Sequence, residues 1–163
     1  MGAENIVITD LVDHRLDLAR SLGAHHSLKI DSNLTEEQTI QRIHALFGGP
    51  PEITIDCGGF ESTIRLSLLA TRSGGCAVIV GMGCSSDVKL PILDALVREV
   101  DIRGVFRYCN DYPAALAMVA NGQIDAKKLI THHFDLTETI KAFETARYGH
   151  GNPIKVMIHC DRS

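Results

Sequence analysis

Blocks of apolar residues recur along the chain, and the most regular block is an apolar run enclosed by glycines. Residues 74–83 read GGCAVIVGMG. A strand that is apolar at every position is typical of a parallel sheet covered by helices on both faces. Ligands of such sheets bind beyond the carboxyl ends of the strands. Here that end is Gly81-Met82-Gly83, where the small residues would let a ligand approach the backbone closely.

Shorter apolar blocks predict further strands at residues 5–10, 26–30, 53–57 and 100–106. Between them, apolar residues at helical spacing predict helices. Thr35 and Gln38 form a capping box at the start of one helix, and Gly23 and Gly48 are suited to end two of them. This alternation predicts an α/β fold with a doubly wound parallel sheet. In residues 100–106 polar residues alternate with apolar ones, which indicates an edge or half-covered strand.

The regular alternation of predicted strands and helices ends after Tyr108. We expect a helix over residues 111–121, a strand over 130–134, a helix that carries Ile140 and Phe143, and a last strand over 154–159. This tail is typical of a second layer or a second domain. The expected domains are therefore residues 1–109 and residues 110–163.

Composition narrows the possible partners. The 163 residues are 45% hydrophobic and 22% charged, and the net charge is -4 without any basic run, so nucleic acid is not an expected partner. No apolar segment approaches the ~20 residues of a membrane span, and no signal peptide is recognisable. The five cysteines include no C-x-x-C pair, so we expect free, buried or half-buried thiols in a cytoplasmic protein.

Asp10 is the first candidate for binding chemistry. It ends an apolar strand just before a helix, and in nucleotide-binding sheets such an acid accepts hydrogen bonds from ribose hydroxyls and repels the extra phosphate of NADP. Arg15, one turn into the helix, would lie near the adenosine part. The alternative, equally favoured by the residues alone, is that Asp10 only caps the helix.

The glycine fingerprint that normally anchors a dinucleotide is absent. A strand and a G-x-G-x-x-G turn usually precede the ribose acid by about 20 residues, but only nine residues precede Asp10. Gly81-Met82-Gly83 does not replace the fingerprint, because it follows a late strand and a lone G-x-G is a weak signal.

Two further groups of polar residues are open to a functional interpretation. Arg107 and Tyr108 follow the strand over residues 100–106, and both donate hydrogen bonds that suit a hydroxylated substrate; an exposed strand end or an interface explains them equally well. The histidines include two adjacent pairs, at 25–26 and 132–133. Side chains of neighbouring strand residues diverge, so we expect surface or structural roles and no metal ligation.

Several longer segments together resemble one known family. The chain is similar to the zinc-dependent medium-chain dehydrogenases, and to their polyol-oxidising branch in particular, over essentially its whole length. The segments that carry the resemblance are ITDL with RL at residues 8–11 and 15–16, TRSGG at 71–75, VGMG at 80–83, REVDI at 98–102, VFRYCN at 105–110 and AFE at 142–144.

The resemblance implies a role for each matching position. Asp10 and Arg15 would hold the adenosine ribose of NAD. Arg107 and Tyr108 would contact the polyol, and the strand between Val100 and Val105 would pair with a neighbouring subunit in a homo-oligomer. The residues implied to line the nicotinamide half are Val80, Gly81, Met82, Val105, Phe106 and Arg107.

The departures from the family imply an incomplete molecule. The family's zinc ligands, its first Rossmann strand and its glycine turn have no counterpart here, so we expect an incomplete Rossmann-type sheet, with a vacant position between the strands at residues 5–10 and 53–57. We expect no zinc binding and no turnover from this chain alone. Two alternatives stay open: a non-catalytic remnant that binds nucleotide weakly or joins full-length subunits, and a nucleotide-fold methyltransferase in which Asp10 holds the ribose of S-adenosylmethionine.

Overall fold

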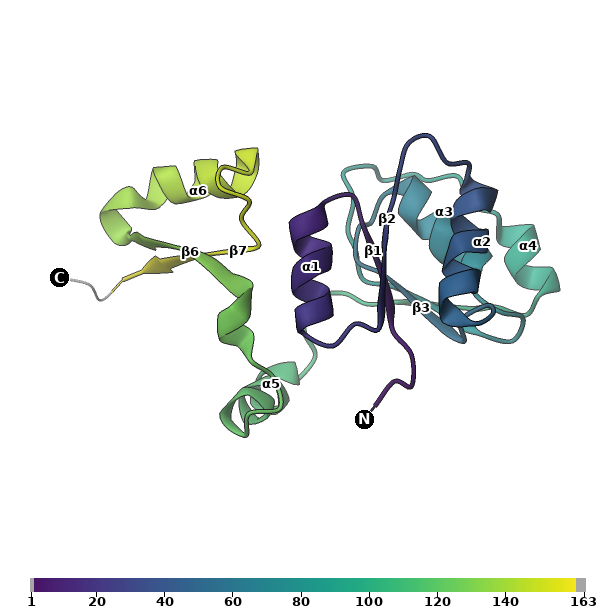
Figure 1. Cartoon of the computed structure of the whole chain (residues 1–163), viewed down its shortest axis with the longest axis horizontal. Coiled ribbons are helices and arrows are strands. Elements are labelled where there is room, and N and C mark those ends of the chain that lie inside the picture. Colours follow the sequence, from purple (N-terminus) through teal and green to yellow (C-terminus); the bar gives the residue numbers. More distant parts are fainter. Residues whose placement is uncertain (1, 161–163) are drawn as a thin grey trace. The chain divides into compact units, whose positions relative to one another are not determined.

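Strands and helices alternate through the first part of the chain (Figure 1). The computed structural model describes residues 2–160, which form two compact units, one up to Arg107 and one from Tyr108 onward. The elements of the first unit are β1 (Val7–Asp10), α1 (Asp13–Ser21), β2 (His26–Lys29), α2 (Glu36–Phe47), β3 (Ile53–Asp56), α3 (Glu61–Ala70), β4 (Cys76–Ile79), α4 (Ile92–Val97) and β5 (Asp101–Gly104). This is the predicted alternation, and it confirms the α/β class.

All the strand pairs are parallel, but the strands of the first unit form two sheets. One sheet contains β1 and β2, and the other has the order β3-β4-β5. Within residues 2–160 no ladder joins β1 to β3. The sheet is therefore interrupted at the position where the sequence predicts a vacant strand, and the two parts are called here the β1–β2 half and the β3–β5 half.

Helix α2 follows its sequence signals closely. The backbone N of Gln38 donates to Thr35 Oγ1 at 3.2 Å, and the backbone N of Thr35 donates to Gln38 Oε1 at 3.0 Å, which confirms the capping box. The helix ends at Gly48, whose φ of 87° is left-handed and favours glycine. These local signals explain why the helix begins after Thr35 and ends before Gly48.

The same helix links the two halves of the sheet. Arg65 of α3 donates two hydrogen bonds to the carboxylate of Glu36, at 2.9 and 3.0 Å. At the other end of α2, Asn5 Nδ2, just before β1, donates to the carbonyl of Phe47 at 3.1 Å. Because α2 is joined to both halves, the interruption between them lies inside one unit.

The hydrophobic core lies in the β3–β5 half, on the face that α3 and α4 cover. Its buried members are Ile64, Leu68, Ala77, Ala95 and Val100. Helix α1 lies on the other face of the unit, where it contacts β1 and β2 (Figure 1). The expectation that β4 is covered on both faces is wrong. Ala77 and Ile79 pack into the core, whereas Cys76 and Val78, which point to the second face of the strand, stay half-buried.

The second unit is built on a pair of parallel strands. Its elements are α5 (Asp111–Ala120), the 3-10 turn η1 (Ala126–Leu129), β6 (Ile130–Asp135), the 3-10 turn η2 (Leu136–Glu138), α6 (Thr139–Tyr148) and β7 (Lys155–His159). Its buried residues include Phe134, Ala142 and Thr145, whereas α5 buries none of its residues. At η2, hydrogen bonds from Lys141 and from the backbone of Asp135 lower the pKa of Glu138.

The cysteines are free, as predicted, but their expected burial is wrong. Only Cys76 is half-buried, and the other four are exposed. They follow strand ends or lie in connecting segments, where few neighbours surround them. Along residues 2–160, none of the helices has the length and apolar character needed to cross a bilayer.

Candidate functional site

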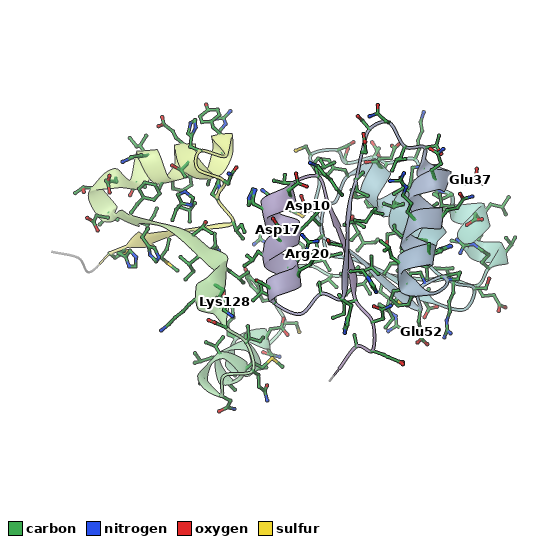
Figure 2. The ribbon with its side chains drawn as sticks, in the orientation of Figure 1. Asp10, Asp17, Arg20, Glu37, Glu52 and Lys128 are labelled. Carbon is green, nitrogen blue, oxygen red and sulfur yellow. The ribbon has the colours of Figure 1, made fainter. Side chains whose placement is uncertain are left out.

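Asp10 lies at the carboxyl end of β1, where the chain turns into α1 (Figure 2). Its Oδ1 accepts a hydrogen bond from the backbone N of Val12 at 2.9 Å, so it does fix the start of the turn. Its Oδ2 lies 3.9 Å from Nη1 of Arg15, and the Asp10 side chain keeps 29% exposure. The structure thus brings Asp10 and Arg15 together. The capping alternative and the ribose alternative are compatible, because Oδ2 accepts no hydrogen bond in this arrangement and stays open to a ligand hydroxyl.

The loops that follow β3 and β4 meet backbone to backbone. A Cβ at Gly81 would overlap the backbone N of Gly59, and a Cβ at Gly83 would overlap the carbonyl O of Gly59. Gly59 itself has a φ of 72°, a conformation that L side chains rarely adopt. The glycines that the sequence marked for ligand approach are therefore first of all required by this loop contact.

Asp56 is a residue of this edge that sequence reasoning missed as a site residue. It ends β3 and is 4% exposed, and its Oδ2 accepts a hydrogen bond from the backbone N of Gly59 at 2.8 Å. Its carboxylate therefore holds the Gly58-Gly59 turn against the loop after β4. An acid that ends an apolar strand is the signal that would have found it, and the same signal singled out Asp10.

The residues expected to line the nicotinamide half lie on exposed strand ends of the first unit. Val80 and Met82, after β4, are 43% and 78% exposed, and Val105 and Phe106, after β5, are 47% and 70% exposed. Each strand end thus presents apolar surface at the same edge, but no cover closes over it within the described residues. That edge can offer a flat apolar surface to a planar ring.

Arg107 is the last residue of the first unit, and its backbone is strained. Its φ is 53°, and its guanidinium lies 5.0 Å from the centroid of the Phe106 ring, within cation–π range. Tyr108 opens the second unit, where its ring meets that of Tyr112 edge-on with centroids 5.1 Å apart. A shared substrate contact of Arg107 and Tyr108 remains a prediction.

An open surface hollow lies away from these residues. It has a volume of about 340 Å³, lies among α2, α3 and α4, and includes His44, Thr71 and Arg98 in its lining. None of the nominated site residues lines it. The candidate site is therefore an open edge of a sheet.

Zinc has no fitting donor set in this part of the protein. Within residues 2–160 no group of three or more His, Cys, Asp or Glu side chains is arranged to hold a metal ion. The nearest approach is a pair on neighbouring strands, where Nδ1 of His133 lies 2.7 Å from Nε2 of His159. A catalytic zinc site needs three protein ligands, and the described residues do not bring three together.

This fold, with Asp10 at the carboxyl end of β1, is typical of Rossmann-type α/β proteins of the dehydrogenase class. Parallel strands joined by crossover helices, with an acid after the first of them, are the frame in which such proteins hold a nucleotide. The family model of the zinc-binding dehydrogenases matches residues 1–121, and the chain belongs to that family.

The comparisons with individual proteins agree. Sorbitol dehydrogenase of Mus musculus is 45% identical over 161 residues, covering 99% of this chain and 44% of that protein, and sorbitol dehydrogenase of Gallus gallus gives the same values. The crystal structure of an oxidoreductase/dehydrogenase of unknown specificity from Escherichia coli, involved in membrane biogenesis, has a TM-score of 0.84 at 28% identity, over 98% of this chain and 45% of that one. The chain thus spans less than half the length of these relatives and matches their carboxyl-terminal portion.

Proposed function

We propose that this chain is the coenzyme-binding portion of an NAD-dependent polyol dehydrogenase, an enzyme that transfers a hydride from a polyol such as sorbitol to NAD and forms a ketose. The observation that carries the proposal is the 45% identity to sorbitol dehydrogenase over nearly the whole chain. Family membership also favours NAD over S-adenosylmethionine, and so argues against the methyltransferase alternative.

The residues fit the adenosine end of NAD. The Asp10 side chain is partly exposed at the end of β1, and its Oδ2 lies 3.9 Å from Nη1 of Arg15. A carboxylate there accepts hydrogen bonds from the ribose hydroxyls and repels a 2′-phosphate, so NAD is bound in preference to NADP. NAD supplies the hydride acceptor, and this chain's part is to hold and orient the coenzyme, with Val80, Gly81, Met82, Val105, Phe106 and Arg107 toward its nicotinamide half.

The chain by itself is inactive in this proposal. Polyol oxidation in the family depends on zinc to lower the pKa of the alcohol, and within residues 2–160 the ligands for it are missing. A sorbitol-plus-NAD assay with added zinc is expected to show no NADH above background. Measurable NADH would contradict this part of the proposal.

Coenzyme binding is tested by titration calorimetry with NAD, NADP and S-adenosylmethionine. We expect weak binding of NAD and weaker binding of the other two. Replacing Asp10 by Ala removes hydrogen bonds to a charged acceptor, which corresponds to an about 10–100-fold loss in NAD affinity, and should abolish the preference over NADP. Asp17 is an exposed acid on α1 (Figure 2), so Asp17→Ala is the matched control. It should leave the NAD affinity and the preference over NADP unchanged. Equal binding of NAD by the wild type and Asp10→Ala would contradict the assignment of Asp10.

A second function, association with further subunits, is favoured by one observation. All four residues of β5 are exposed, and within residues 2–160 β5 pairs only with β4, so the edge between Val100 and Val105 is open to another strand. We therefore keep the non-catalytic alternative, in which the chain joins full-length subunits through this edge. Light scattering on the wild type and on Ile102→Lys tests it, since a charge on this edge should shift any oligomer to monomer.

A further inference from the structure

Asp56 ends β3 at the point where two loops meet. Its carbonyl O accepts hydrogen bonds from the backbone N of Val80 and of Gly81, both at 2.9 Å, and its Oδ2 accepts one from the backbone N of Gly59 at 2.8 Å. This residue thus contacts the loop after β3 through its side chain and the loop after β4 through its backbone. At 4% exposure Asp56 is closed to a ligand, in contrast to the partly exposed Asp10.

The turn that the carboxylate holds contains two successive glycines. Glycine has more backbone freedom than any other residue, so a Gly58-Gly59 turn keeps one conformation only where a neighbouring group fixes it. The φ of Gly59 is 72°, in the left-handed region. The hydrogen bond from the Gly59 N–H to Asp56 Oδ2 stabilises this conformation, and removing the acceptor leaves that N–H without its partner.

The position of Gly59 also determines the path of the loop after β4. A Cβ at Gly59 would lie 2.5 Å from backbone atoms of residues 81–83, so the two backbones touch. A displacement of Gly59 is therefore transmitted to that segment, because closely packed atoms leave no free space between them. Val80 and Met82, in and beside this segment, have the exposed apolar side chains that we propose to face the nicotinamide half.

The carboxylate of Asp56 acts here as a hydrogen-bond acceptor and not as a charge. Along residues 2–160 none of the ion pairs involves Asp56. An amide side chain of the same shape has a carbonyl oxygen that accepts in the same place. Asp56→Asn can therefore keep the hydrogen bond to Gly59, whereas Asp56→Ala cannot, and the two substitutions separate loss of the acceptor from loss of the charge.

We infer that Asp56 is a positioning residue for the nicotinamide half of the coenzyme: through the Gly59 N–H it fixes the backbone of residues 81–83 and so the places of Val80 and Met82. This role rests on the proposed function, since it concerns the same coenzyme edge. Asp56 itself touches no ligand. Its loss should therefore weaken the binding of whole NAD and leave the binding of the adenosine half, at Asp10 and its neighbour on α1, unchanged.

NMR titrations of the whole chain with NAD and with AMP, which is the adenosine half of NAD, measure this difference. In the wild type we expect NAD to bind about tenfold more tightly than AMP. Asp56→Ala should reduce that ratio to about one without changing the affinity for AMP, and Asp56→Asn should restore it. Glu52→Ala removes an exposed acid just before β3, so it is the matched control and should leave the ratio unchanged. An Asp56→Asn variant that behaves like Asp56→Ala would show that the charge acts, and would overturn the inference.

Amide exchange in the chain without ligand tests the same mechanism independently of NAD. The acceptor that Asp56→Ala removes serves the N–H of Gly59. We nevertheless expect the amides of Gly59, Val80 and Gly81 all to exchange at least about tenfold faster, and to recover in Asp56→Asn. The amide of Ile43, a buried residue of α2, reports global unfolding and should be accelerated less. Faster exchange of Gly59 alone, or equal acceleration of all four amides, would overturn the inference.

The remaining outcomes are also decisive. If circular dichroism shows that Asp56→Ala does not fold, Asp56→Val takes its place with the same expectations, because a β-branched side chain suits a strand and fills the site without an acceptor. Loss of AMP affinity together with NAD affinity, or equal affinity of the wild type for both, overturns the inference. A wild type that binds neither ligand rejects the proposed function, and with it the coenzyme role of Asp56. A wild type that prefers NAD, together with an unaffected Asp56→Ala, rejects the role of Asp56 alone.

Discussion

The β1–β2 half and the β3–β5 half of the sheet differ in what stabilises them. The β3–β5 half contains the hydrophobic core, in which Leu68 and Ala77 are fully buried against α3 and α4. The β1–β2 half has α1 on one face, anchored by Leu16, and depends on α2 for its connection to the rest. Asp10, the proposed ribose ligand, thus belongs to the half with the fewer buried contacts. Coenzyme affinity should therefore depend on what holds the two halves together.

The largest expected loss in the free energy of unfolding comes from removing a core side chain of the β3–β5 half. Leu68 is fully buried among the core residues, so Leu68→Ala should lower the free energy of unfolding by about 3–5 kcal/mol. Leu16 is 4% exposed but lies outside the core cluster, so Leu16→Ala should cost about 2 kcal/mol. Urea unfolding followed by circular dichroism measures both. Equal costs would mean that the two halves are stabilised alike.

A smaller effect is expected where the loops after β3 and β4 touch. Gly81→Ala places a methyl group against the backbone of Gly59, and overpacking of this kind costs about 1–3 kcal/mol. Gly104→Ala is the matched control, because no atom lies within 4 Å of a Cβ there. Thermal unfolding of the pair should show a lower melting temperature for Gly81→Ala only. A normal melting temperature for that variant would show that the loops separate readily.

The capping box of α2 gives the smallest effect, and it tests the link between the halves. Thr35→Ala removes the hydroxyl that accepts from Gln38, a change worth about 1 kcal/mol. Ser62→Ala, an exposed position on α3, should stay within about 0.5 kcal/mol of the wild type. If α2 is the link, Thr35→Ala should also speed amide exchange in β1 and β2. Unchanged exchange in these strands would show that the β1–β2 half is held by other contacts.

Much of the fold was readable from the sequence because its signals are local. The apolar run at residues 76–80, the capping box of Thr35 and Gln38, and the terminal glycines act within a few residues, and the elements appear where they predict them. The vacant strand position followed from the resemblance to a family whose first strand has no counterpart here. Burial was harder to predict: β4 is apolar on both sides, but cover on its second face depends on segments distant in sequence.

The candidate site was only partly readable. An acid at a strand end identified Asp10, and its proximity to Arg15 follows from one turn of helix. Asp56 carries the same signal but was passed over, because its hydrogen bond to Gly59 is visible only once the turn is folded. The grouping of Val80, Gly81 and Met82 with Val105 and Phe106 depends on strand order, which short-range patterns do not encode.

The most direct test of the account is backbone amide exchange, followed by NMR, in the isolated chain. If the sheet is open between β1 and β3, the amides of Val7, Thr9, Ile53 and Ile55 should exchange rapidly, whereas those of Ile8 and Thr54, which face a paired strand, should be protected. This alternation along two separate strands is the predicted result. Equal protection of Ile55 and Thr54, and of Thr9 and Ile8, would show a closed sheet and contradict the account.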